Sequence, residues 1–130
     1  CTKGYTVFRG FCYKAFKIAK TFNYASEACG EDSGTLAMPR DAETNAFLVY
    51  LASNLHKSVG NRWYIWIGLH RQRDEGSFEW VDGSALGDYS PWANGKPYDM
   101  GRRHCVSYSA LREDNWVNLP CSDRLYFICQ

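Results

Sequence analysis

Residues 61–69 read Asn61-Arg62-Trp63-Tyr64-Ile65-Trp66-Ile67-Gly68-Leu69, and the other segments of the chain can be placed around them. Seven of these nine residues are aromatic, aliphatic or glycine. A short run rich in aromatic and β-branched residues is typical of a strand buried on both faces. We therefore predict a central core strand here. Gly68 stands out within it, because glycine weakens a strand and usually marks a bulge or a close backbone approach.

The composition indicates an ordinary globular protein, since 45% of the 130 residues are hydrophobic and 22% are charged. One domain is expected at this length, with room for a real core. No apolar run approaches the roughly 18 residues that a membrane span needs. The net charge of +1 favours no partner, and without a strongly basic helix no nucleic-acid partner is expected. No nucleophile signature such as Gly-x-Ser-x-Gly is present, so we expect no enzyme and no catalytic residue.

Two amphipathic helices are predicted before the core strand. Thr21 is a suitable N-cap for the first, and Gly30 is expected to end it. Asp41 is expected to cap the second, which should end near His56-Lys57, where positive charge suits the helix dipole. The buried faces are predicted to hold Phe22, Ala25, Ala28 and Cys29 in the first helix and Phe47, Leu48, Leu51 and Leu55 in the second. The water-facing side of the second helix is predicted to hold Glu43, Asn45 and Asn54.

The remaining segments read as strands and turns around one long loop. A hairpin is predicted at residues 5–16, and the last strands are expected at residues 105–108 and 126–129. Residues 84–104 contain several glycines and prolines and little periodicity, which predicts a long irregular loop. Long structured loops in compact domains are usually functional.

Six cysteines without a Cys-x-x-Cys pair favour disulfides over a zinc site, and disulfides indicate secretion or a cell-surface ectodomain. Six cysteines allow 15 pairings, and the residues alone do not select one.

A series of motifs carries a family resemblance. In chain order they are Trp66-Ile67-Gly68-Leu69, Tyr89-Ser90-Pro91-Trp92, Gly95-Lys96-Pro97, Trp116 and Pro120-Cys121. Together with the six cysteines, this series resembles the C-type lectin-like domain from Cys1 to Cys129. The resemblance implies a single domain over residues 1–130 with an α+β C-type lectin-like fold, in which two helices accompany antiparallel sheets and the long loop. It also implies the disulfides Cys1–Cys12, Cys29–Cys129 and Cys105–Cys121.

The resemblance also locates a calcium site, and this sequence departs from it. Sugar-binding members of the family hold calcium with an acid- or amide-containing triplet, an acid before the fourth-strand cysteine, and an Asn-Asp pair, because Ca²⁺ takes 6–8 oxygen ligands. The matching positions here are Lys96-Pro97-Tyr98, Arg103, Val117 and Asn118. Only Asn118 retains a ligand oxygen, so we expect no calcium at this site and no cofactor.

An auxiliary calcium site of the family is matched only by Glu75 and Asp99, since Arg71, Arg103 and His104 occupy its other positions. Glu75, Asp99 and His104 are an alternative cluster for zinc or another transition metal. The neighbouring Arg102 and Arg103 oppose a cation, so solvated loop residues are the favoured interpretation.

Three functions compete on these residues. The favoured one is an extracellular, calcium-independent lectin-like module that binds a glycan or glycoconjugate, preferably anionic, because arginine forks match sulfate, phosphate and carboxylate. The candidate ligand-binding residues are Lys96, Tyr98, Asp99, Arg102, Arg103, His104 and Asn118. The first alternative is a protein-binding module that uses the same loop and its aromatic residues. The second is a calcium-dependent lectin with an unusual site, using Asp114, Asn115 and Asn118.

Overall fold

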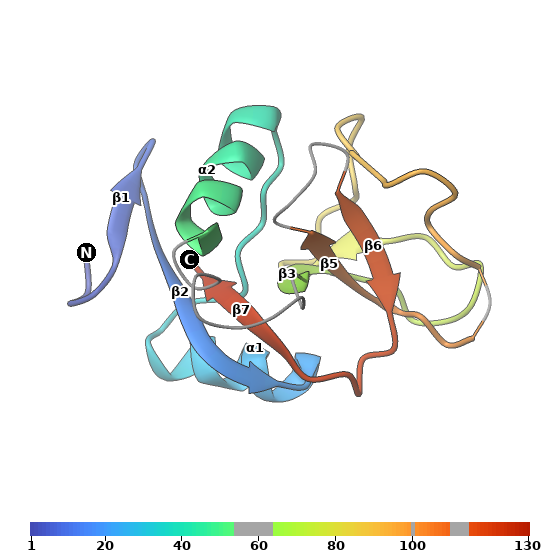
Figure 1. Ribbon diagram of the computed structural model, residues 1–130, viewed down its shortest axis with the longest axis horizontal. Helices are drawn as coiled ribbons and strands as arrows, with labels where there is room; N and C mark the ends of the chain where they lie inside the picture. The colour runs from blue at the N-terminus through green and yellow to red at the C-terminus, as the bar shows by residue number, and fades with distance from the viewer. Residues whose placement is uncertain (54–63, 100, 110–114) are drawn as a thin grey trace.

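The predicted core strand is present as β3 (Tyr64–His70), in which Ile65, Trp66, Ile67 and Leu69 are fully buried. The structure is a computed structural model and describes residues 1–53, 64–99, 101–109 and 115–130 (Figure 1). The predictions for Asn54, Leu55, His56-Lys57, residues 61–63 and Asp114 lie outside the described residues.

The described strands form one sheet around β3. The others are β1 (Thr6–Phe8), β2 (Phe11–Lys20), β4 (Glu79–Trp80), β5 (Cys105–Ser109), β6 (Trp116–Leu119) and β7 (Leu125–Cys129). Their order is β1-β2-β7-β3-β5-β6, with β4 paired to β3. All pairs are antiparallel except β3 with β7, which is parallel, so the expectation of purely antiparallel sheets is wrong for this pair. Parallel pairing needs a long connection, and the whole segment between β3 and β7 supplies it.

The two helices are α1 (Phe22–Glu31) and α2 (Ala42–Ser53), and they make the fold α+β. Figure 1 shows both in the half of the molecule that contains β2 and β7. The predicted caps are confirmed: Tyr24 N donates to Thr21 Oγ1 at 3.4 Å, and Thr44 N donates to Asp41 Oδ1 at 2.8 Å. Of the predicted apolar faces, Phe22, Ala25, Cys29 and Leu48 are buried, and Ala28, Phe47 and Leu51 are partly buried. No helix among the described residues is long and apolar enough to cross a membrane.

The prediction that Gly30 ends the first helix is wrong, because α1 continues through it to Glu31. The chain turns slightly later, where Ser33 has a left-handed φ of 61°. A Cβ on Gly34 would lie 2.3 Å from the backbone oxygen of Gln130. The position that requires glycine is therefore Gly34, where the chain leaves α1 and runs beside Gln130.

The prediction that Asn45 faces water is wrong, since only 4% of this residue is exposed. It shares the inner side of α2 with Leu48 and Ala52, three and seven residues further on, as a helical period requires. Its Oδ1 accepts a hydrogen bond from Trp116 Nε1 at 3.1 Å, and its Nδ2 donates to Asn115 Oδ1 at 3.3 Å. Burial of this amide is tolerated because both ends are hydrogen-bonded.

Gly68 allows a close approach of backbone, as predicted. A Cβ at this position would lie 2.8 Å from the Leu36 carbonyl oxygen and 2.9 Å from Val81 Cγ2. The pairing of β3 with β5 also shifts register between Trp66 and His70. Glycine at position 68 thus lets the core strand lie directly against the segment that follows α1.

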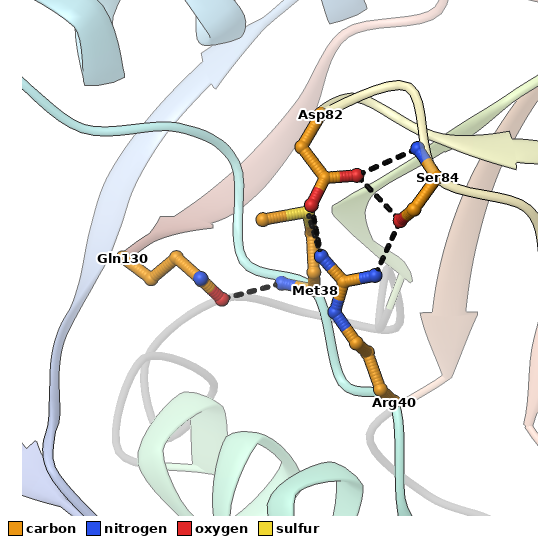
Figure 2. A network of polar contacts seen from close by, with 5 residues as sticks. All are labelled: Met38, Arg40, Asp82, Ser84 and Gln130. Carbon is orange, nitrogen blue, oxygen red and sulfur yellow. Dashed lines mark hydrogen bonds and ion pairs between the residues drawn. The ribbon is translucent and has the colours of Figure 1, made fainter.

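Arg40 links the segment before α2 to the turn after β4 (Figure 2). Its Nη1 donates to Ser84 Oγ at 2.6 Å, and its Nη2 forms an ion pair with Asp82. Hydrogen bonds from Ser84, and then Arg40, lower the pKa of Asp82 to about 2. On the other side of the segment, Met38 N donates to Gln130 Oε1 at 2.8 Å.

Three disulfides fasten the chain in the pairing that the resemblance implies: Cys1–Cys12, Cys29–Cys129 and Cys105–Cys121. The second joins α1 to β7, and the third joins the start of β5 to the turn after β6.

Candidate ligand-binding site

The loop of residues 84–104 rests on a rigid aromatic base. Trp116, at the start of β6, is fully buried, and its carbonyl accepts a hydrogen bond from Ala93 N at 2.9 Å. Tyr89 and Trp92 pack edge-on against the Trp116 ring, with centroids 5.8 and 5.6 Å away. Figure 1 shows the loop, in yellow and orange, at the opposite end of the long axis from the N-terminus.

The side chain of Asn118 fixes the second half of the loop. Its Oδ1 accepts from Tyr98 N at 2.7 Å, and its Nδ2 donates to Tyr98 O at 2.6 Å and to Arg103 O at 2.8 Å. Asn118 is fully buried on β6, opposite Val106 of β5. Its polar atoms are therefore beneath the surface and hydrogen-bonded to backbone, which suits a support of the loop better than a surface contact. Its role is to hold Tyr98 and Arg103 at a fixed separation.

Two cationic side chains lie close to the Tyr98 ring. Tyr98 is 48% exposed, and Lys96 Nζ and Arg103 Cζ lie 5.4 and 5.3 Å from its ring centroid. These distances are within the range of cation–π attraction. Arg102 is exposed beside them, with a left-handed φ of 54°. We call Lys96, Tyr98, Arg102 and Arg103 the basic loop face.

The charges of the basic loop face are available to a ligand. Among the described residues, no carboxylate forms an ion pair with Lys96, Arg102 or Arg103. The two other predicted loop residues are occupied differently: Asp99 Oδ1 lies 3.6 Å from Arg71 Nη1, and His104 Nε2 lies 2.7 Å from Asp74 Oδ1. The seven candidate residues therefore divide into the basic loop face, in which Tyr98 and Arg102 are exposed and Lys96 and Arg103 are half-buried, two residues paired with neighbours, and a buried asparagine.

Arg71 is one of the bases that the resemblance places at the auxiliary calcium positions, and it was not among the predicted ligand-binding residues. It follows β3 directly, its side chain is 1% exposed, and its Nη2 donates to Tyr98 O at 2.8 Å. The guanidinium also lies over the Phe78 ring, with Cζ 4.8 Å from the centroid. A charged residue at the end of a buried strand and below a long loop is the signal that identifies it.

The hypothetical metal cluster of Glu75, Asp99 and His104 is not formed. His104 is bonded to Asp74 instead, and Asp99 is beside Arg71. Within the described ranges, no group of three or more His, Cys, Asp or Glu side chains is placed to hold a metal ion.

The described residues do not fit calcium at the family's sugar site either. The oxygen of Asn118 is used by the Tyr98 N–H, while Lys96 and Arg103 bring positive charge to the remaining positions. Of the alternative ligand set, Asn115 and Asn118 are both fully buried, and Asp114 lies outside the described residues. Calcium requires several convergent oxygens, and these side chains do not provide them.

Comparison with known proteins agrees with this fold. The family profile described as "Lectin C-type domain" matches residues 18–130. Collectin-10 of Gallus gallus is 36% identical over 120 residues, which cover 91% of this chain and 40% of the collectin. The alpha-N-acetylgalactosamine-specific lectin of Patiria pectinifera is 30% identical, covering 97% of this chain and 77% of that lectin. The chain thus spans less than half of collectin-10 but most of the second relative.

Among solved structures, a calcium-independent type II antifreeze protein superposes with a TM-score of 0.83 at 26% sequence identity. The superposition covers 99% of this chain and 92% of the antifreeze protein. Taken with the profile match, these similarities show that the chain belongs to the C-type lectin family.

Proposed function

We propose that this chain is an extracellular recognition domain that binds an anionic carbohydrate through the basic loop face, without calcium. The extracellular assignment is supported by three disulfides, which persist in oxidising compartments. Carbohydrate as the ligand class is supported by family membership and by a relative that is named for its sugar specificity.

The observation that carries the proposal is the exposed Tyr98 ring with the cationic groups of Lys96 and Arg103 close to it. The exposed part of the Tyr98 ring offers apolar contact to a sugar, while the cations close to it pair with sulfate, phosphate or carboxylate groups. A bidentate arginine contact adds geometric selectivity to the attraction of charge. The face therefore suits a sugar that carries an acidic group better than a neutral one.

Calcium independence is supported by the chemistry of the same positions. Lys96 and Arg103 supply positive charge where calcium would otherwise supply it. The Oδ1 atom of Asn118 already accepts a hydrogen bond from Tyr98 N in the loop backbone.

The test is the double substitution Lys96→Ala with Arg103→Ala, assayed on a sulfated and an uncharged polysaccharide in parallel. Native protein should bind the sulfated polymer, retain that binding in EDTA, and lose it as ionic strength rises. Two lost charge contacts at up to about 1 kcal/mol each predict an affinity loss of up to roughly thirtyfold.

A matched control is Lys3→Ala with Arg124→Ala, which removes the same charges from exposed positions outside the loop. This control should bind like the native protein. If the loop variant also binds the charged polymer unchanged, the proposal is wrong and a protein partner becomes the leading alternative. Binding that disappears in EDTA would instead support a calcium-dependent lectin.

Thermal unfolding provides an independent test of the calcium assignment. A ligand that binds only the native state raises Tm, so a functional calcium site would show itself at millimolar calcium. We expect the Tm of the native chain to be the same in calcium and in EDTA. A higher Tm in calcium than in EDTA would show that oxygen ligands converge in this chain after all.

A further inference from the structure

We propose that Arg71 is a positioning residue whose buried guanidinium takes the structural place of a metal ion beneath the basic loop face. It holds the segment of Tyr98 and Asp99, and with it the ring that Lys96 and Arg103 flank. The ligand-binding consequence rests on the proposed function, whereas the ordering of the loop does not.

Both the side chain and the backbone of Arg71 contact the loop of residues 84–104. Its Nη2 donates to the Tyr98 carbonyl at 2.8 Å, and its Nη1 lies 3.6 Å from Asp99 Oδ1. Its own backbone N donates to His104 O at 2.8 Å, so the residue is tied to the far end of the loop as well. One residue at the end of β3 therefore reaches both ends of the segment that forms the basic loop face.

A metal ion under such a loop would collect carbonyl and carboxylate oxygens around a positive charge. Arg71 does this with a covalently attached cation, using one carbonyl and one carboxylate. The Phe78 ring on its flank adds a further favourable contact for a desolvated cation. A bound metal is lost to a chelator, but a guanidinium is permanently present and permanently charged.

Stability alone does not explain this arginine. Among the described residues, its buried Nε has no hydrogen-bond partner, and Asp99 is 61% exposed. A partly satisfied buried charge is a poor stabiliser, and an apolar side chain of similar size often replaces one at little loss. The specific contacts to Tyr98 and Asp99 are what a replacement would lose.

Arg71→Met is a usable test because the structure predicts that it folds. The Tyr98 carbonyl keeps its bond from Asn118 Nδ2, and Asp99 is exposed enough to be solvated by water. Arg71→Lys keeps the charge but loses the planar fork that reaches two oxygens. Arg73→Met, at an exposed position two residues away, is the matched control.

The measurement is amide hydrogen exchange at Tyr98 and Asp99 by NMR, without ligand, in calcium and in EDTA. We expect exchange in Arg71→Met to be at least several-fold faster than in the native chain, with Arg71→Lys between the two. The control should match the native chain, and Tm should change little. Calcium should not slow amide exchange in the native chain or in any of the variants.

Unchanged exchange at Tyr98 and Asp99 in Arg71→Met would overturn the proposal, as would an equal acceleration throughout the sheet. If Arg71→Met does not fold, the Arg71→Lys variant is the test. Amide exchange faster than in the native chain would support the role of the planar guanidinium, and exchange at the native rate would overturn the proposal.

Binding measurements distinguish a positioning role of Arg71 from direct contact between Arg71 and the ligand. On the sulfated polysaccharide, Arg71→Met should bind more weakly with an unchanged ionic-strength dependence, since the cations of the basic loop face remain, whereas Lys96→Ala should reduce that dependence. If native protein does not bind the polymer but the exchange results hold, the proposed function fails and the role of Arg71 stands.

Discussion

Gly68 is the single residue on which the packing of β3 depends most directly. Substitution by alanine would bring a Cβ within 2.8 Å of the Leu36 carbonyl oxygen and 2.9 Å of a Val81 methyl group. Overpacking of this kind destabilises by about 1–3 kcal/mol, so Gly68→Ala should lower the free energy of unfolding measured in urea. Gly30 is a suitable contrast, because it lies in α1 and a Cβ added there would meet nothing within 4 Å. Gly30→Ala should stabilise by up to about 1 kcal/mol; equal effects of the two changes would contradict this interpretation.

Two asparagines show where inference from residue type ends. Asn45 and Asn118 are both buried, and their partners are reached only through the tertiary fold, as with Asn115, 70 residues beyond Asn45. Amides are mostly exposed in proteins, so surface placement is the reasonable prediction for each. The same argument applies to Arg71, whose burial depends on a loop that begins further along the chain.

At the scale of elements, caps and apolar periodicity predicted both helices, because these signals are local. The parallel contact of β3 with β7 was not predictable in this way, since pairing direction depends on how distant segments return to the sheet. The loop of residues 84–104 was predicted from its glycines and prolines, but the hydrogen bonds that order it come from β6 and the end of β3. The resemblance therefore indicated the candidate site, and only the structure separated its residues at the surface from the buried residues that support them.

The turn after β4 provides a prediction for pH. The folded pKa of Asp82 is lowered to about 2 from 3.8, first by hydrogen bonds from Ser84 and then by Arg40. A lowered carboxyl pKa stabilises the fold above the unfolded pKa, and that stabilisation is lost as pH falls through the folded value. The native chain should therefore lose stability between about pH 4 and about pH 2 more steeply than Asp82→Asn.

The measurement for Asp82 is Tm as a function of pH, with Asp88→Asn as the control. Asp88 is exposed in the following loop and forms no ion pair with the described residues. Parallel acid profiles for the native chain and Asp82→Asn would show that the Arg40 network in Figure 2 does not contribute to stability.

At the scale of the whole molecule, Cys29–Cys129 closes most of the chain, with a sequence separation of 100. The loop-entropy model assigns about 4–5 kcal/mol to a loop of this length. The double substitution of Cys29 and Cys129 by alanine should therefore lower Tm markedly, and loss of two buried side chains adds to the effect. The matched double substitution of Cys1 and Cys12, separated by 11 residues, should cost less, about 2–3 kcal/mol. A larger loss from the short loop would contradict the entropic argument.

The position of the loop along the long axis of the molecule has a consequence for avidity. Figure 1 places the N-terminus at one end and the loop at the other. Molecules tethered to a surface through their N-termini would therefore all present the same face outward. Each face offers only a few exposed charge contacts, so a single copy holds a polyanion weakly. When one copy holds a repeating polymer, a neighbouring copy meets the next repeat at a high effective concentration. Simultaneous binding by several copies therefore increases the apparent affinity by about 10²–10⁴-fold without any new contact.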